Sequence, residues 1–265
     1  MHHTAAPHSA VLVILLVIVP LLVLGLYLFA ALRMRTTAPW SLWRIASFTA
    51  GILLIVAAKV PPLADWAHHD LRGHMLQHLF LGMFGPLGLV FGAPGSLLLR
   101  SVPAPLARAL MNLLRRGPVR VLIHPVTAAC LDIGGMYLLY LTPFYALSMK
   151  SPGLFIFLHV HFVLSGYLFT WSVAGPDPAP HRPSRPVRLT VIFLATAAHA
   201  ILGKLMYAWG YPHGTLASPE EVQAAAQWMY YGGDAAEFCI ILGFFKQWFR
   251  QRSTLPDIWA DKAHH

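Results

Sequence analysis

The sequence predicts an all-α, polytopic membrane protein, namely a seven-transmembrane-helix bundle with its N-terminus outside and its C-terminus in the cytoplasm. Of the 265 residues, 57% are hydrophobic and 11% are charged, whereas about 25% of the residues of a soluble domain are charged. A helix that crosses a bilayer needs about 20 consecutive apolar residues. Seven such stretches are present, at residues 10–32, 41–60, 73–99, 119–142, 153–174, 188–209 and 223–246.

The distribution of basic residues predicts the orientation, because Lys and Arg accumulate in cytoplasmic loops. With the N-terminus outside, 15 of the 19 Lys and Arg residues fall on the cytoplasmic side. The other four are Lys59, Arg72, Lys150 and Lys204. This asymmetry also explains the net charge of +9, since basic loops face anionic lipid headgroups. The charge therefore does not call for a nucleic-acid partner.

The first and third apolar stretches need individual arguments. Residues 10–32 resemble the apolar part of a signal peptide, but the stretch is too long and lacks a basic leader and a small-residue cleavage site. We expect it to be a retained helix. Residues 73–99 exceed one crossing, and we expect Pro86 and Pro94 to kink or end this helix. Its many glycines favour close packing between helices in lipid, so we expect it inside the bundle.

The remaining segments connect or follow the predicted crossings. Residues 100–120 place leucines on one side and arginines on the other, as in an amphipathic helix on the inner membrane surface. The proline-rich segment GPDPAPHRPSRP at 175–186 predicts a polar cytoplasmic connection, and residues 250–265 predict a polar tail. Neither an internal repeat nor a linker is evident, so we expect a single integral membrane domain over 1–265.

His74 and His78 are the strongest candidates for a metal site. Residues four apart lie on one face of a helix, and this spacing lets two imidazoles share a metal ion. Imidazole binds copper, zinc, iron or nickel, and a nearby thioether such as that of Met75 adds a preference for Cu(I). The pattern therefore favours copper near the outer face. The alternative is that both histidines only form hydrogen bonds between helices.

A second pair of histidines lies in the outer part of the fifth stretch. His159 and His161 are two residues apart, so on a helix they point to nearly opposite sides. At most one of them is expected to join a site formed by His74 and His78. We favour His161 and expect His159 to face another neighbour or the interface.

Four ionisable residues form a second layer near the predicted midplane. They are Asp132 in the fourth stretch, His199 in the sixth, and Asp234 and Glu237 in the seventh. Asp234 and Glu237 are three residues apart and therefore neighbours on one helix face. Ionisable groups inside a membrane find partners or serve a function. We weigh a proton or metal path equally with a polar network that holds helices together.

Four segments carry a resemblance to a known family. The segment HMLQHLFLGMFGPLGLVFGAPGSLLLR at 74–100 closely resembles the third helix of the CtaG family, the seven-helix assembly factors for caa3-type cytochrome c oxidase. The similarity continues through HPVTAACLDIGGMYLLYLTPFYALS at 124–148 and LHVHFVLSGYLFTWSV at 158–173, and it ends with MYYGGDAAEFCIILGFFKQWFR at 229–250. It extends over helices three to seven.

The resemblance implies a function and a set of site residues. It implies a bacterial plasma-membrane protein that helps to mature a terminal cytochrome c oxidase, with oxidase subunits as partners. It also implies copper as the cargo, bound transiently near the outer face and inserted into the oxidase. By this resemblance His74, His78 and His161 occupy the histidine positions of the family. Such a protein is not an enzyme.

Two other functional classes stay open at this stage. One is a haem-binding membrane protein, with histidines from facing helices as axial ligands. The other is a metal-coupled or proton-coupled transporter, with the midplane residues Asp132, His199, Asp234 and Glu237 as its pathway. A hydrolase finds no support, since the chain lacks a GxSxG motif, a P-loop and a dinucleotide fingerprint.

Overall fold

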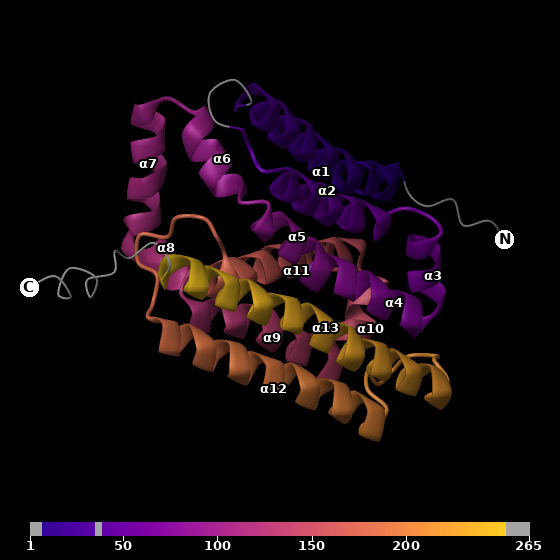
Figure 1. Cartoon of the computed structure of the whole chain (residues 1–265). Coiled ribbons are helices and arrows are strands. Elements are labelled where there is room, and N and C mark those ends of the chain that lie inside the picture. Colours follow the sequence, from indigo (N-terminus) through magenta and orange to yellow (C-terminus); the bar gives the residue numbers. More distant parts are fainter. Residues whose placement is uncertain (1–6, 35–38, 253–265) are drawn as a thin grey trace, which may run out of the picture.

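The structure is a computed structural model that describes residues 7–34 and 39–252, and the regular secondary structure of these residues is entirely helical (Figure 1). The all-α prediction is therefore confirmed for the described part of the chain. The helices, with one π-helical segment labelled η2, are α1 (Pro7–Arg33), α2 (Leu42–Ala57), α3 (Leu63–His69), α4 (Leu71–His78), η2 (Leu79–Phe84), α5 (Gly85–Phe91), α6 (Pro94–Ser101), α7 (Ala104–Arg115), α8 (Gly117–Leu122), α9 (Pro125–Leu141), α10 (Phe144–Lys150), α11 (Pro152–Ala174), α12 (Arg185–Trp209) and α13 (Pro219–Arg252).

Several of these helices have the length and apolar character of membrane spans. Within the described residues, four qualify on their own, and a fifth qualifies if α9 and α10, which meet at an angle of 83°, form one bent span. The four are Leu15–Arg33, Leu71–Phe91, Pro152–Ala174 and Arg185–Trp209. Helix α2 is apolar but shorter. The chain thus has the helices of a polytopic membrane protein, whereas the number of seven crossings and the outward N-terminus stay predictions.

The third predicted span is interrupted where the sequence suggests. Helices α4, η2 and α5 form one continuous stretch over Leu71–Phe91. The stretch ends at Gly92 and Ala93, and Pro94 then occupies the first turn of α6, where a missing N–H is tolerated. Pro86 does not end the helix, because it follows the π-helical segment, whose wider turn changes the backbone register.

This interrupted helix lies inside the bundle, as its glycines predict. Its span is 56% buried, the largest share of the four. A Cβ atom added to Gly166 of α11 would lie 2.0 Å from the carbonyl oxygen of Gly82. Likewise, a Cβ atom added to Gly51 of α2 would lie 2.7 Å from the carbonyl oxygen of Gly85. Small residues thus let three helix backbones approach each other closely.

Two helices differ in extent from the predicted spans. Within the predicted span 119–142, helix α9 begins only at Pro125. The helical conformation is interrupted at Ile123 and His124, after the short helix α8. Pro125 then starts α9, as proline favours the first turn of a helix. The predicted span 223–246 is shorter than α13, which extends from Pro219 to Arg252. Of the predicted tail, residues 250–252 are therefore helical, and 253–265 lie outside the described residues.

The connecting segments include a short exposed helix and an irregular stretch. Helix α7, within the predicted amphipathic segment 100–120, leaves every residue at least partly exposed, Leu106 and Leu113 included. The segment between α11 and α12 is an irregular connection, and it also forms hydrogen bonds with the start of α6. The carboxylate of Asp177 accepts hydrogen bonds from the backbone N–H groups of Gly95, at 2.9 Å, and Ser96, at 2.6 Å.

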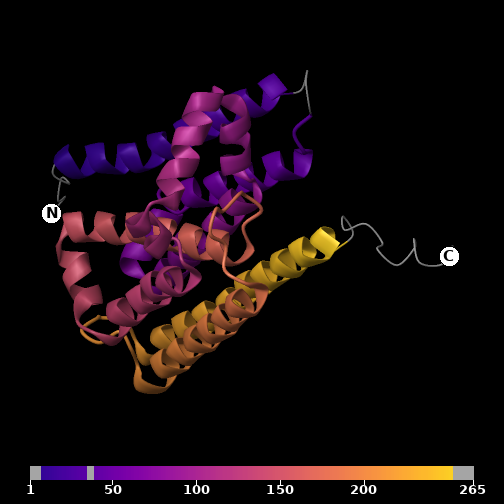
Figure 2. The ribbon, with the colours of Figure 1, turned by 90° about the vertical axis from the view of Figure 1, so that its left-hand side faces the viewer.

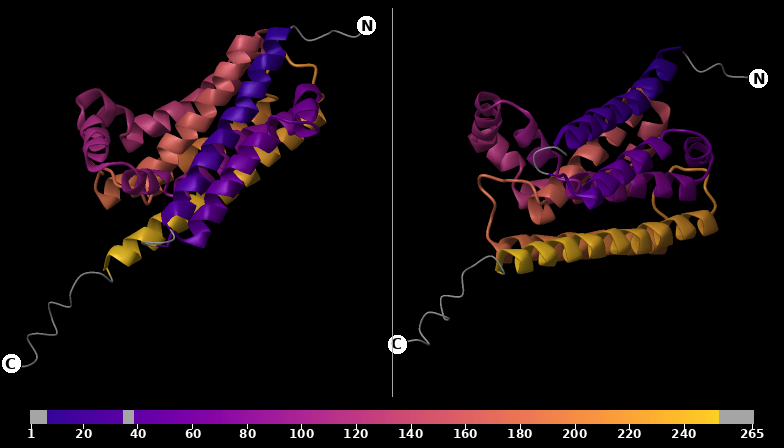
Figure 3. Two further views of the ribbon diagram at one scale, coloured as in Figure 1. Left: turned by 90° about the horizontal axis from the view of Figure 1, so that it is seen from above. Right: turned by 45° about the horizontal axis from the view of Figure 1, so that its top comes forward.

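The long helices lie side by side with the buried core between them (Figures 2 and 3). Helices α12 and α13 run together along one flank, and α1 lies on the opposite flank, next to α2. The largest buried cluster unites residues of α4, α9, α11, α12 and α13, including Met75, Tyr140, Leu202 and Met229. We call the end formed by α3, α10 and the start of α13 the histidine end (Figure 1).

Candidate functional site

A small buried cavity lies at the histidine end, between α4, α9, α10 and α11. Its volume is about 20 Å³, which is room for about one water-sized particle. Three histidines line it together with polar and apolar neighbours. The lining residues are His74, Gln77, His78, Leu81, Leu139, Tyr140, Ser148, Phe155, Leu158, His159 and Phe162.

His159 is held in a defined chemical state by Gln77. The Gln77 Nε2 donates to the carbonyl oxygen of Ala58 at 2.6 Å, and this contact fixes which end of the amide is the oxygen. The Gln77 Oε1 lies 3.1 Å from His159 Nε2 and can only accept, so Nε2 carries the proton. The Nδ1 of a neutral His159 therefore has a free lone pair, and it is buried without a hydrogen-bond partner in the described ranges.

His74 is oriented by two tyrosines. Its Nε2 lies 3.3 Å from the hydroxyl of Tyr140. Its ring meets the ring of Tyr145 edge-on, with centroids 4.9 Å apart. The Nδ1 is buried and finds no hydrogen-bond partner among the residues that the structure describes.

His78 lies one helical turn below His74. Its ring packs edge-on against Phe162, with centroids 5.0 Å apart, and against Tyr140, at 5.8 Å. The Nε2 is buried, again with no partner in the described part of the chain. Buried polar atoms are nearly always hydrogen-bonded in folded proteins. Three histidines that each have such a nitrogen line one cavity, which makes this cavity the candidate ligand site.

The structure places His159, and not the favoured His161, beside His74 and His78. The His161 Nε2 lies 3.1 Å from the carbonyl oxygen of Leu131 in α9. It also lies 2.8 Å from the place where Gly135 would carry a Cβ atom, so the ring packs against α9. The two histidines do point to different sides, as their spacing predicts, but the rotation of α11 about its axis turns His159 toward the cavity.

Met75 does not reach the cavity. Its side chain is fully buried in the main hydrophobic cluster, which also contains Met136, Met206 and Met229. Met75 follows His74 directly and is thus rotated by about 100° around α4. Its thioether therefore packs in the core.

The histidines are not a preformed metal centre. Within the described residues, no group of three or more His, Cys, Asp or Glu side chains is arranged to hold one ion. His74, His78 and His159 share a cavity, but a metal would need their rings to turn toward one point. The three histidines thus do not surround a single point, and they form a set of uncharged potential ligands.

Next to the cavity lie Phe155, His68 and Lys59. Phe155 lines the cavity, and its ring lies 4.0 Å from that of His159 and 5.4 Å from that of the exposed His68. The Nζ of Lys59 lies 5.9 Å from the same Phe155 ring. Lys59 is only 8% exposed, and burial lowers its pKa from 10.5 to about 6.

The histidine pattern of the sequence did not single out Gln77, Tyr140 or Lys59. Gln77 lies three residues after His74 and one before His78, so a polar residue within an apolar helix was the available signal. Lys59 is a single cation that ends an apolar stretch. Tyr140 carried no signal in the sequence, because its place depends on how α9 packs against α4.

The midplane residues form two separate contacts. His199 Nδ1 and Glu237 Oε1 lie 3.8 Å apart in the buried interface of α12 and α13. Asp132 instead accepts a hydrogen bond of 2.9 Å from the hydroxyl of Ser165. Asp234 is half-buried and joins neither contact. The predicted layer is thus divided between two helix interfaces.

The fold and the cavity define a helical protein with membrane-type spans and a histidine-lined cavity at one end. The chain belongs to the cytochrome c oxidase caa3 assembly factor (Caa3_CtaG) family, whose model matches residues 25–251. The resemblance described from the sequence is thereby confirmed.

Relatives in mycobacteria share part of the chain. Uncharacterized proteins of Mycobacterium bovis and Mycobacterium tuberculosis are 32% identical over 182 residues, which cover 66% of this chain and 27% of each relative. A protein of Mycobacterium leprae is 30% identical over 191 residues, 69% of this chain and 29% of its own length. The chain thus spans less than a third of the length of these relatives. No solved structure matches.

Proposed function

We propose that this chain helps to assemble a cytochrome c oxidase by holding a copper ion transiently between His74, His78 and His159 and releasing it to an oxidase subunit. The observation that carries the proposal is that three histidines line one cavity and that each has a buried ring nitrogen without a partner among the described residues. Copper is the cargo of the protein in this proposal, and the chain acts as a carrier without catalytic chemistry.

The chemistry of the cavity favours Cu(I) over divalent ions. Imidazole is a suitable ligand for copper, zinc, iron and nickel. Each lining histidine is flanked by apolar or aromatic side chains, and the lining contains neither a carboxylate nor a thiolate. No anionic ligand in the lining neutralises the charge of a bound ion. The free-energy penalty of burying an ion rises steeply with the number of its charges. A monovalent ion is therefore favoured.

Gln77 supports the ligand role of His159. Metal-bound histidines usually donate their second N–H to an oxygen acceptor, which fixes the ring and the tautomer. The Gln77 oxygen occupies that position at His159 Nε2, and Ala58 holds Gln77 in turn. This leaves Nδ1 as the nitrogen that binds the ion.

The incomplete arrangement of the rings suits a carrier. Because the rings must turn before they converge on an ion, part of the binding free energy is used for that change. Binding is then weak enough for release to a recipient with a preformed site. The histidine end faces the outer side of a bacterial plasma membrane in this proposal, where the oxidase subunit receives the ion.

The test is the retention of Cu(I) by the detergent-purified chain, measured with a competing chelator. We expect the wild-type chain to retain copper, and both the His74→Ala/His78→Ala double variant and His159→Ala to lose it. His161→Ala is the matched control on the same helix and is expected to retain copper. Gln77→Leu should weaken binding by about 10-fold to 100-fold, and Gln77→Glu, which keeps an acceptor oxygen, should weaken it less.

Several outcomes would contradict the proposal. Equal copper in the wild type and the double variant would exclude this cavity. Loss of copper in His161→Ala, with retention in His159→Ala, would restore the orientation that the sequence suggested. A Soret absorbance in the purified protein would assign the histidines to haem. Absence of copper from the wild-type chain and from every variant would indicate a protein that assists assembly without binding copper.

A further inference from the structure

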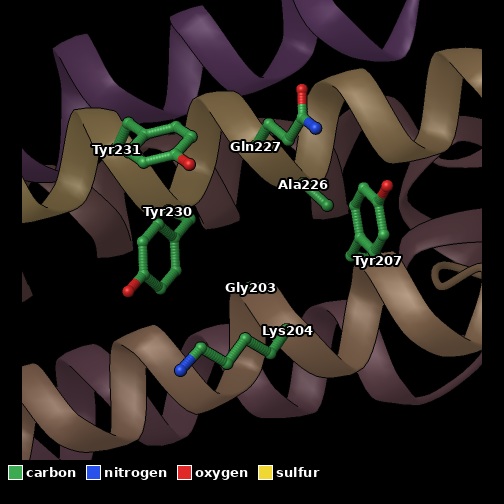
Figure 4. Close-up of a pocket in the computed structure, with 7 residues that line it drawn as sticks. All are labelled: Gly203, Lys204, Tyr207, Ala226, Gln227, Tyr230 and Tyr231. Atoms are coloured by element: carbon green, nitrogen blue, oxygen red, sulfur yellow. The ribbon is translucent and has the colours of Figure 1, made fainter.

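A second and larger hollow opens on the surface between α12 and α13 (Figure 4). We call it the α12–α13 groove. Its volume is about 310 Å³. Five side chains with polar groups line it together with the small residues Gly203 and Ala226, namely those of Lys204, Tyr207, Gln227, Tyr230 and Tyr231.

Lys204 is the charged residue of this groove, and its charge is unmatched. Within residues 7–34 and 39–252, Lys204 forms neither an ion pair nor a hydrogen bond. Its closest described interaction is with the ring of Tyr230, whose centroid lies 5.6 Å from Nζ. A cation over an aromatic face gains far less free energy than a full ion pair in an apolar medium.

The surroundings of the groove are apolar. Ile201 and Trp209 on α12 and Tyr231 and Phe238 on α13 are large exposed side chains. Helix α12 has the length and hydropathy of a membrane span, so this surface is suited to face lipid. An ionised lysine in that position is costly unless a negative group lies next to it.

The depth of the ammonium group indicates where that negative group comes from. Lys204 lies five residues before Trp209, the last residue of α12, which is about 7.5 Å along a helix axis. Its side chain points away from Tyr207, and thus away from the end of the helix, toward the hydroxyl of Tyr230 (Figure 4). Lys204 thus lies within the candidate span Arg185–Trp209, where a carboxylate on a membrane-spanning helix of a partner can pair with it.

We propose that the α12–α13 groove binds a transmembrane helix of a partner protein through a carboxylate that pairs with Lys204. The hydroxyl groups of Tyr207 and Tyr230 and the amide of Gln227 supply further hydrogen bonds to such a carboxylate. This site is separate from the histidine cavity, and the inference does not depend on copper binding.

The test uses synthetic transmembrane peptides in phosphatidylcholine vesicles that contain the full chain. Three Leu/Ala-rich peptides carry Glu, Gln or Leu at the depth of Lys204, and binding is followed by energy transfer between dyes. We expect the Glu peptide to bind about tenfold more tightly than the Leu peptide, since a charge-assisted hydrogen bond is stronger than a neutral one. Lys204→Gln should abolish this preference.

Control variants separate the charge of Lys204 from its packing. Lys204→Arg should retain the preference, and Lys150→Gln, which changes an exposed lysine on α10, should leave it unchanged. A Lys204→Glu chain should instead prefer a peptide that carries Lys. Copper retention is expected to be the same in all of these chains, so that a failure here is distinguishable from a failure of the histidine site.

Other outcomes would overturn the inference. Equal binding of the Glu and Leu peptides to the wild-type chain would remove the proposed contact, and equal binding of the Glu and Gln peptides would remove the role of charge. Native mass spectrometry supplies a further arm with phosphatidylglycerol and phosphatidylcholine. Retention of phosphatidylglycerol that depends on Lys204, without any peptide preference, would assign the groove to a lipid headgroup.

Discussion

Single side chains determine what the histidine cavity can bind. Gln77 has both ends of its amide engaged, so it leaves only one nitrogen of His159 free for a ligand. The sequence predicted that at most one histidine of the pair in the fifth stretch would join His74 and His78, and it favoured His161. The structure places His159 there instead, because two residues that differ by two positions are distinguished only by the rotation of α11 about its axis.

Among single residues, Lys59 makes the stability of the folded protein depend on pH. Burial lowers the pKa of Lys59 to about 6, against 10.5 for an ordinary lysine. Between these two values the unfolded chain binds a proton that the folded chain does not bind. Raising the pH through this range therefore stabilises the folded state, by up to about 1.4 kcal/mol per pH unit from this residue. Below pH 6 both states are protonated, and the contribution no longer changes.

Replacing Lys59 by methionine should remove this dependence. We expect Lys59→Met to be more stable than the wild type at pH 7 and to show a flatter rise of stability between pH 6.5 and pH 9. The measurement is chemical or thermal unfolding in detergent at several pH values. Lys150→Met, at an exposed lysine, should behave like the wild type. Parallel curves for the wild type and Lys59→Met would show that Lys59 is protonated in the folded protein at neutral pH.

At the scale of the elements, close backbone contacts fix how α11 packs against the π-helical segment η2. Gly82 and Gly166 meet where a side chain on α11 has no space. The sequence predicted from its glycines that the third stretch lies inside the bundle. It did not predict the π-helical turn, because residues 79–84 have no composition that distinguishes a π-helix from an α-helix.

Gly166→Ala should therefore destabilise the fold. Its Cβ atom would lie 2.0 Å from the Gly82 carbonyl oxygen, and overpacking of this kind typically lowers stability by about 1 to 3 kcal/mol. The measurement is the midpoint of thermal unfolding in detergent. Gly134→Ala is the matched control, because a Cβ atom at Gly134 of α9 meets nothing within 4 Å. That change should leave stability unaltered or raise it by up to about 1 kcal/mol.

For the whole molecule, the connection between α11 and α12 ties distant parts of the chain together. Asp177 accepts from the first turn of α6. Arg182 donates to the carbonyl oxygens of Gly175 and Asp177 at 2.6 and 2.7 Å, and Gln247 of α13 donates to Ala174. Burial lowers the pKa of Arg182 to about 10, which still leaves it charged at neutral pH.

Asp177→Ala should loosen α6 without unfolding the bundle. The change removes two charge-assisted hydrogen bonds, and we expect a loss of about 1 to 3 kcal/mol. Hydrogen exchange should become faster at the N–H groups of Gly95 and Ser96 and remain unchanged in α11. Asp65→Ala, at an exposed residue of α3, is the control and should change stability by less than about 0.5 kcal/mol. Unchanged exchange at Gly95 would show that α6 is held by packing alone.

The sequence predicted the class of the whole fold better than its details. Apolar length and low charge indicated membrane-type helices, and these properties are summed over many residues. The end of α4–α5 at Pro94 was predictable from local chemistry. The break before Pro125 and the 83° bend between α9 and α10 were not, since they depend on how the helices dock. The division of Asp132 from His199 and Glu237 has the same cause.

The two ends of the bundle differ in their charged residues, and this difference bears on the route of the proposed copper ion. Helices α6, α7 and α8, whose sequences contain arginines, lie at the end opposite to the histidine end (Figure 1). If a copper ion is bound as proposed, these positive charges would oppose its approach from that end. We therefore expect donor and recipient to reach the histidine end in turn, so that the ion is exchanged at one side of the membrane.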